Sequence, residues 1–228
     1  MSGVTDCYQP AERRFGLTRG CLQVALAARQ PVVIITKNAL VLRDLDLLQE
    51  MAGLRLIHVN VSLTTLDEEL ARTMEPRTSR PAARLRAVAV LTKAGIPTAV
   101  MTAPIIPGLS DSEIPALLAA SAHAGAISAR YILVRLPLAV SAIFTDWLQQ
   151  SQPTLATRVE AMIRATRVGK LNASEFGVRM KGSGLIADQI AKTFSVFARK
   201  YGLDKPMPDL DFTQFQPPLA KSGQRRLF

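Results

Sequence analysis

The sequence is poor in cysteine and in aromatic residues. Its 228 residues include only two cysteines, Cys7 and Cys21, and 5% of them are aromatic. Two thiols exclude a disulfide-rich scaffold, and they exclude any metal or cluster site that needs three or four thiolates from this chain. The shortage of aromatic side chains argues against a dense stacking surface for single-stranded nucleic acid.

Long hydrophobic runs are also missing. No stretch of about 18 apolar residues occurs, so no bilayer span is predicted. The first residues lack the charged, apolar and small-residue zones of a secretory signal. We therefore expect a cytoplasmic protein with no membrane partner. With 48% hydrophobic and 20% charged residues, the composition is that of a globular domain.

The net charge of +10 is unevenly distributed along the chain. Residues 151–205 hold ten basic and four acidic side chains, whereas residues 1–150 hold 15 and 12. A basic C-terminal third favours a polyanionic partner such as nucleic acid, or simply keeps the protein soluble. The candidate phosphate contacts are Arg158, Arg164, Arg167 and Lys170.

Short apolar runs rich in β-branched residues recur along the first 137 residues. They cover residues 31–36, 56–62, 97–103 and 130–134. Their length and continuous apolarity predict parallel strands that are covered on both faces. Amphipathic segments between them predict helices, and strand–helix alternation with right-handed crossovers gives either a doubly wound sheet or a barrel.

One helix predicted near the N-terminus aligns four apolar or small residues on a single face. These are Leu17, Cys21, Val24 and Ala28, at positions i, i+4, i+7 and i+11. This spacing predicts that the aligned face packs against the core. Cys21 is therefore expected to be a buried core residue.

After residue 137 the alternation stops. Helices are predicted at 138–150, at 153–166 and in a last segment that ends near Tyr201. We therefore divide the chain into a barrel at 1–137, a helical extension at 138–205 and a loosely ordered basic tail at 206–228.

Ligands of parallel α/β folds bind at the carboxyl ends of the strands. Lys37 follows the first predicted strand, Ser62 ends the second and Arg135 follows the fourth. A lysine at such an end binds an anion or, if desolvated, forms a Schiff base as in an aldolase. Ser62 serves either as a ligand contact or as a cap for the helix that starts near Leu66.

Two other polar pairs also have structural alternatives. Asp6 and Gln9 have the spacing of a capping box. Glu75 and Arg77 flank a proline and fit a local surface ion pair.

Several short motifs resemble one family in their order and spacing. They are Gly3–Glu12 (GVTDCYQPAE), Ile35–Asn38 (ITKN), Val61–Ser62, Met74–Arg77 (MEPR) and Ala103–Gly108 (APIIPG). As a set they resemble the branch of radical S-adenosylmethionine proteins that is similar to spore photoproduct lyase and is also labelled DNA-repair-photolyase-like. The resemblance extends from about Gly3 to Leu203, including Arg179–Gly184.

This resemblance implies a partial (βα)6 barrel that holds S-adenosylmethionine and a [4Fe–4S] cluster at its open face, where a 5′-deoxyadenosyl radical is generated. By position in the motifs, Thr5 and Asp6 are expected near the amino group of the cofactor. Lys37 is expected at its carboxylate and Ser62 at its carboxylate or ribose, and Arg77 adds charge at the same mouth.

The sequence departs from the family at the cluster. The family binds the cluster with three thiolates in a CxxxCxxC loop after the first barrel strand, and this chain has two cysteines without that spacing. The predicted fold is therefore an incomplete (βα)6 barrel that lacks its first strand and is followed by a C-terminal helical region. Three explanations stay open: Met1 is not the true start, the cluster-binding segment is a separate polypeptide, or the protein is degenerate.

These observations favour the C-terminal portion of a radical S-adenosylmethionine protein, with DNA-repair-lyase-like chemistry by analogy. We expect the chain to be inactive without an upstream cluster-binding segment supplied in cis or in trans. A lysine-dependent aldolase-like barrel enzyme and a non-catalytic basic nucleic-acid-binding module stay open as alternatives.

Overall fold

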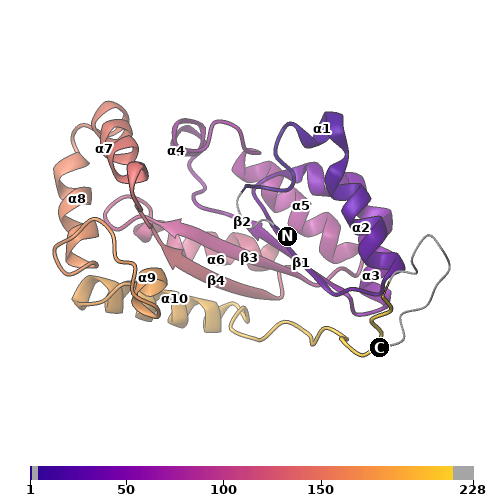
Figure 1. Cartoon of the computed structure of the whole chain (residues 1–228). Coiled ribbons are helices and arrows are strands. Elements are labelled where there is room, and N and C mark those ends of the chain that lie inside the picture. The colour runs from indigo at the N-terminus through magenta and orange to yellow at the C-terminus, as the bar shows by residue number, and fades with distance from the viewer. Residues whose placement is uncertain (2–4, 218–228) are drawn as a thin grey trace.

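The computed structural model describes residue 1 and residues 5–217, and its centre is a four-stranded parallel sheet (Figure 1). The strands follow the order β1-β2-β3-β4. They are β1 (Val32–Thr36), β2 (Ile57–Ser62), β3 (Thr98–Ile105) and β4 (Ser128–Leu133). All four predicted strands are confirmed, since each lies within two or so residues of its predicted bounds.

Helices connect the strands and extend the chain beyond them. Before β3 they are α1 (Glu12–Phe15), α2 (Leu17–Ala27), the 3-10 helix η1 (Ala39–Asp44), α3 (Leu45–Gly53), α4 (Glu68–Met74) and α5 (Pro81–Lys93). After β3 they are η2 (Asp111–Glu113), α6 (Ile114–His123), α7 (Ala139–Ser151), α8 (Ala156–Ala165), α9 (Val178–Lys181) and α10 (Leu185–Lys200). In the described part of the chain, none of these helices has the length and apolarity to cross a membrane.

The helices cover one face of the sheet. Val59, Val61 and Val100 point toward them and belong to the main core. On the other face, Val33 and Ile35 of β1 are 37% and 38% exposed. The prediction that helices cover both faces of the sheet is therefore wrong for β1 within the described residues. Its exposed face also carries apolar side chains, so the sequence of β1 reads like that of a strand buried on both faces. One-sided cover matches a partial barrel rather than a doubly wound sheet.

The buried face of α2 differs from the predicted one. Leu17 and Val24 are 68% and 63% exposed and Cys21 is exposed, so the expected core position of Cys21 is wrong. The buried residues are Thr18, Leu22 and Ala25. The helix has two apolar stripes, and the spacing alone does not show which stripe packs inward.

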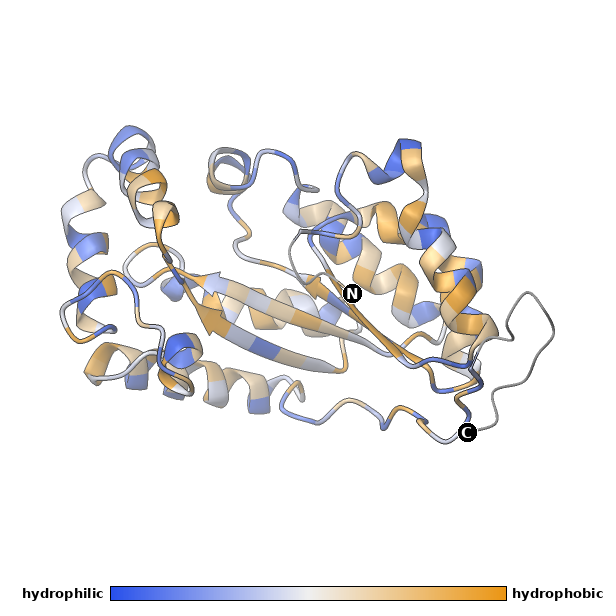
Figure 2. Ribbon diagram, viewed as in Figure 1, coloured by the Kyte–Doolittle hydropathy of each residue, from blue (hydrophilic) through white to orange (hydrophobic). Residues whose placement is uncertain are grey.

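The C-terminal helices contribute to two hydrophobic cores. Buried residues of α10 join the main core, where the rings of Phe194 and Tyr131 lie 4.7 Å apart. A second core, between α7, α8 and the end of β3, includes Leu148 and Ile163. Hydrophobic and hydrophilic residues alternate along these helices, as amphipathic packing requires (Figure 2). The division of the chain at residue 137 stays a prediction.

Residues 206–217 form an extended segment that returns to the amino ends of the strands (Figure 1). The backbone N–H of Asp211 donates to the carbonyl of Arg55, and that of Gln216 donates to the carbonyl of Ala28, each at 2.9 Å. A loosely ordered tail is therefore wrong for this segment, because prolines prevent a helix but not docking along an edge. Residues 218–228 of the predicted tail lie outside the described residues.

Candidate functional site

The candidate site lies at the carboxyl edge of the sheet. Because all four strands are parallel, their carboxyl ends share one edge. The register pairs Thr36 with Val61, so Lys37 and Ser62 follow at neighbouring positions on adjacent strands. The sequence predicted that these two residues lie at the same edge of the sheet, and the structure places them at adjacent strand ends.

Asp6 attaches the N-terminal segment to the end of β1. One carboxylate oxygen accepts from the hydroxyl of Thr36 at 2.7 Å and from the backbone N–H of Tyr8 at 2.9 Å. The other accepts from the backbone N–H of Lys37 at 2.7 Å. The capping-box alternative is wrong, because α1 begins at Glu12 and Gln9 donates to Thr5 instead.

The ammonium of Lys37 binds a buried carboxylate. Its Nζ lies 2.5 Å from Oε1 of Glu75, and Oε2 of Glu75 lies 2.6 Å from the guanidinium of Arg84. Thr64 donates its hydroxyl to the same Oε2 at 3.0 Å. Arg84 is 1% exposed and also donates to the carbonyl of Ser62 at 3.1 Å. This Lys37–Glu75–Arg84 triad therefore joins the ends of β1 and β2.

The triad carries a net positive charge, because it combines two cations with one carboxylate. Burial alone would raise the pKa of Glu75, but the charges of Lys37 and Arg84 hold it below its ordinary value. The carboxylate is therefore ionised at neutral pH, and one positive charge is left over. A surplus cation at the mouth favours an anionic ligand group.

The other predicted residues are placed differently around this edge. Ser62 is 4% exposed, and its carbonyl accepts from the guanidinium of Arg84. Helix α4 is capped by Asp67, so the capping alternative for Ser62 is wrong. Arg77 is exposed and makes no ion pair with described residues, so its predicted surface pair with Glu75 is wrong.

Two hollows flank Asp6. A pocket of about 550 Å³ is lined by Asp6, Asn38 and Arg77 together with Gln9, Pro10, Ala11 and Thr78. This volume is in the range of small-molecule sites. A smaller hollow of about 190 Å³ contains Thr5 and lies toward α1 and α2. Asp6 and Arg77 thus share one pocket, whereas Thr5 lines the smaller hollow.

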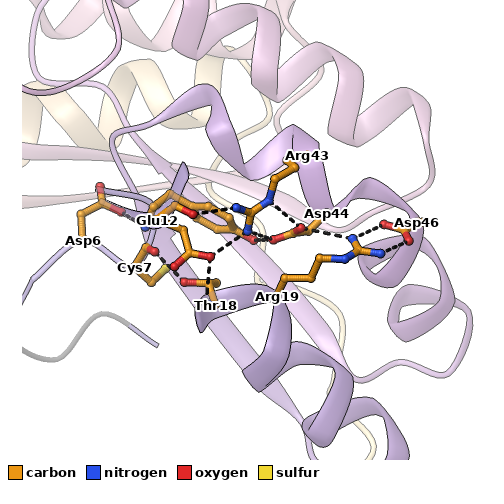
Figure 3. A network of polar contacts seen from close by, with 9 residues as sticks. Asp6, Cys7, Glu12, Thr18, Arg19, Arg43, Asp44 and Asp46 are labelled. Atoms are coloured by element: carbon orange, nitrogen blue, oxygen red, sulfur yellow. Dashed lines mark hydrogen bonds and ion pairs between the residues drawn. The ribbon is translucent and has the colours of Figure 1, made fainter. Parts of the chain in front are cut away.

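A second polar network fixes the segment that carries Asp6 (Figure 3). Buried Asp44 accepts from the hydroxyl of Tyr8 at 3.0 Å and binds the guanidiniums of Arg43 and Arg19. Arg43 also binds Glu12 at 2.8 Å. Burial and the adjacent Asp44 raise the pKa of Tyr8. These contacts are structural, and they hold the N-terminal loop against η1.

The residues of this network and Arg84 were not singled out from the sequence. Arg84 did carry a signal, because it stands at i, i+4 and i+7 with Val88 and Leu91 on the buried face of α5. A charged residue on an apolar stripe needs a buried counter-charge. Tyr8 and Glu12 are part of the motif Gly3–Glu12, but that motif does not distinguish a packing residue from a ligand contact.

The cysteines of this chain do not form a cluster site. Cys7 is partly buried within the N-terminal loop, and Cys21 is exposed on α2. Within the described residues no group of three His, Cys, Asp or Glu side chains is arranged to hold a metal ion. The residues present thus fit an anionic or zwitterionic ligand such as S-adenosylmethionine, but they do not fit a [4Fe–4S] cluster.

The sequence of this chain is similar to those of known proteins. Residues 8–120 match the model of the Radical SAM superfamily. The match begins at Tyr8, two residues after Asp6, and covers β1, β2, β3 and most of α6. It therefore includes Lys37, Ser62 and the whole triad.

The curated relatives are uncharacterized proteins. One from Mycobacterium tuberculosis is 36% identical over 162 residues, which are 70% of this chain and 48% of the relative. Another from Methanocaldococcus jannaschii is 35% identical over 113 residues, 50% of this chain and 42% of the relative. A third from Acidianus two-tailed virus is 36% identical over 107 residues, 47% of this chain and 34% of the relative. The chain thus spans about half of the length of these relatives, or less.

Proposed function

We propose that this chain is the S-adenosylmethionine-binding portion of a radical S-adenosylmethionine enzyme of the spore-photoproduct-lyase-like branch. The observation that carries the proposal is the net positive Lys37–Glu75–Arg84 triad. It lies inside the segment that matches the superfamily and next to Asp6 at the carboxyl edge. A zwitterionic amino acid needs a cation and an acceptor that converge from different strand ends, and this edge supplies both.

Each residue has a defined role in binding. Lys37 offers its ammonium to the carboxylate of the cofactor, and Arg77 adds a second cation from the pocket wall. Asp6 accepts three hydrogen bonds already, and its carboxylate has about four acceptor positions. One position is thus left for the amino group, beside which Thr5 offers a second acceptor. Ser62 supplies a hydroxyl to the carboxylate or to the ribose.

The radical chemistry of the superfamily needs an iron–sulfur cluster. The cysteines of this chain do not supply its ligands, so we assign no cluster step to this chain's residues. We propose that a CxxxCxxC segment supplied in cis or in trans completes the enzyme, and that the protein acts in the cytoplasm.

The rival functions are supported less well. A Schiff-base lysine must reach the carbonyl carbon of its substrate with its amine, whereas the Nζ of Lys37 lies 2.5 Å from Oε1 of buried Glu75, in an ion pair. The basic residues predicted to contact nucleic acid do not form one free face, because Arg167 is 1% exposed and Arg164 binds Glu160 at 2.8 Å.

The test is anaerobic reconstitution followed by an assay for 5′-deoxyadenosine. We expect the chain alone to form no stoichiometric four-iron cluster and no product after reduction. Mixed with a polypeptide that carries a CxxxCxxC loop, it should form 5′-deoxyadenosine, and Lys37→Gln should lower the yield while exposed Arg199→Gln should not. A stable four-iron cluster on the chain alone, or an unaffected Lys37→Gln variant, would refute the proposal.

A further inference from the structure

Two arginines near the end of β4 have no acidic partner. Arg167, just after α8, is 1% exposed, and Arg135 follows β4 and is partly buried. Among the described residues neither guanidinium contacts a carboxylate, and the Nε of each is buried without a hydrogen-bond partner. Buried charges normally have a counter-charge, so two adjacent cations without one indicate a binding site for an anion.

The contacts of the two guanidiniums place them together. Arg167 donates to the carbonyl of Val134, the residue before Arg135, and to that of Val178, each at 2.9 Å. Arg135 reaches the sulfur of Met180 at 3.8 Å. Both side chains therefore contact residues of α9, and Arg167 also contacts the end of β4. Helix α9 lies beside the tip of β4 in Figure 1.

The surroundings do not neutralise this pair. Carbonyl oxygens solvate Arg167, but they carry no net charge. Burial lowers the pKa of Arg167, and the like charge of Arg135 lowers it further. Of the nearby acidic residues, Glu160 binds Arg164 and Glu175 is exposed on the loop before α9. Residues 134–184 carry seven basic and three acidic side chains, so the local field favours an anion as well.

We infer that Arg135 and Arg167 form a phosphate-binding site at the carboxyl end of β4. Guanidinium groups present planar pairs of N–H donors that match phosphate and carboxylate oxygens. Two cations without a counter-charge match a phosphate dianion better than a singly charged carboxylate. Arg135, the more exposed member, makes the direct contact, and Arg167 supports it from behind.

This site lies at the opposite end of the sheet order from Lys37, which follows β1. Phosphate binding itself goes beyond the proposed function. The further statement that this phosphate belongs to the substrate, a phosphate monoester, rests on the proposed function.

The test is calorimetric titration of the purified chain with inorganic phosphate, with dimethyl phosphate and acetate as the diester and carboxylate probes. We expect saturable binding with the order phosphate, then dimethyl phosphate, then acetate. Arg135→Gln should weaken phosphate binding by about tenfold or more, the usual effect of losing a charged hydrogen bond. The control Arg199→Gln removes an exposed arginine at the end of α10 and should change nothing.

If circular dichroism shows that Arg135→Gln is unfolded, the titration is made with Arg135→Lys instead, because lysine keeps the positive charge but lacks the planar pair of donors. The inference is overturned if phosphate does not saturate the chain, if acetate binds as tightly, or if the Arg135 and Arg199 variants behave alike. S-adenosylmethionine binding should persist in Arg135→Gln. If the wild-type chain binds phosphate but not S-adenosylmethionine, the proposed function is refuted and the phosphate site is supported.

Discussion

Replacing Glu75 by glutamine should destabilise the protein strongly. The change keeps the size of the side chain and an acceptor oxygen, but it leaves Arg84 buried at 1% exposure without a counter-charge. Removing one partner of a buried ion pair costs about 3–5 kcal/mol. Arg84 keeps its bonds to the carbonyls of Ser62 and Ser79, so we expect about 2–4 kcal/mol. In a chain of this size that loss lowers the Tm by roughly 5–15 °C.

Urea denaturation of the Glu75→Gln variant gives the measurement, and Glu68→Gln is the matched control. Glu68 is exposed and lies 3.8 Å from exposed Arg80, so its loss should cost less than about 1 kcal/mol. Equal unfolding free energies for the two variants would refute the buried triad.

The difference in stability between the wild type and the Glu75→Gln variant should depend on pH. The pKa of Glu75 is lower in the folded state than its ordinary value of 4.5, so the folded state binds fewer protons than the unfolded state in that window. Its stabilisation is therefore complete above about pH 4.5 and is lost as the pH falls through the folded-state pKa. The stability difference between wild type and Glu75→Gln should shrink on acidification below that pH, and a difference that grows would contradict the assignment.

Three further changes test other parts of the structure. Tyr8→Phe removes the hydroxyl that donates to buried Asp44 and should cost about 1–3 kcal/mol in urea denaturation, whereas a neutral result would contradict that bond. Gly182→Ala places a methyl group 2.9 Å from a core leucine side chain. It should therefore lower the Tm more than Gly177→Ala, where φ is also positive but the added methyl group meets open space; equal losses would rule out the close contact. Cys21 should react with a thiol reagent in the folded protein at the rate of an exposed cysteine, and protection would restore the predicted core position.

The sequence predicted the backbone of the sheet well, because β-branched runs separated by helical spacing depend on local chemistry. It also placed Lys37 and Ser62 at one edge, since both stand at the ends of parallel strands. The face that α2 buries was not predictable, because Leu17 and Leu22 belong to two apolar stripes of similar strength. Only packing against the sheet chooses between such stripes.

The ion-pair partners of the charged residues could not be predicted from the sequence either. Glu75 stands two residues from Arg77 but binds Lys37 and Arg84, which lie on β1's end and on α5. Such pairing depends on how separate elements meet, and local spacing does not contain that information. The docking of residues 206–217 was missed for the same reason, since its hydrogen bonds reach residues more than 150 positions away.

Equilibrium dialysis of the chain against S-adenosylmethionine tests the central claim most directly. The account predicts saturable binding by the wild-type chain, and a Lys37→Gln variant that is weaker by about tenfold or more through the loss of a charged contact to the cofactor carboxylate. The Arg199→Gln variant should bind like wild type. Binding that is absent, or that is equal in the Lys37→Gln and wild-type chains, would contradict the assignment of this edge as the cofactor mouth.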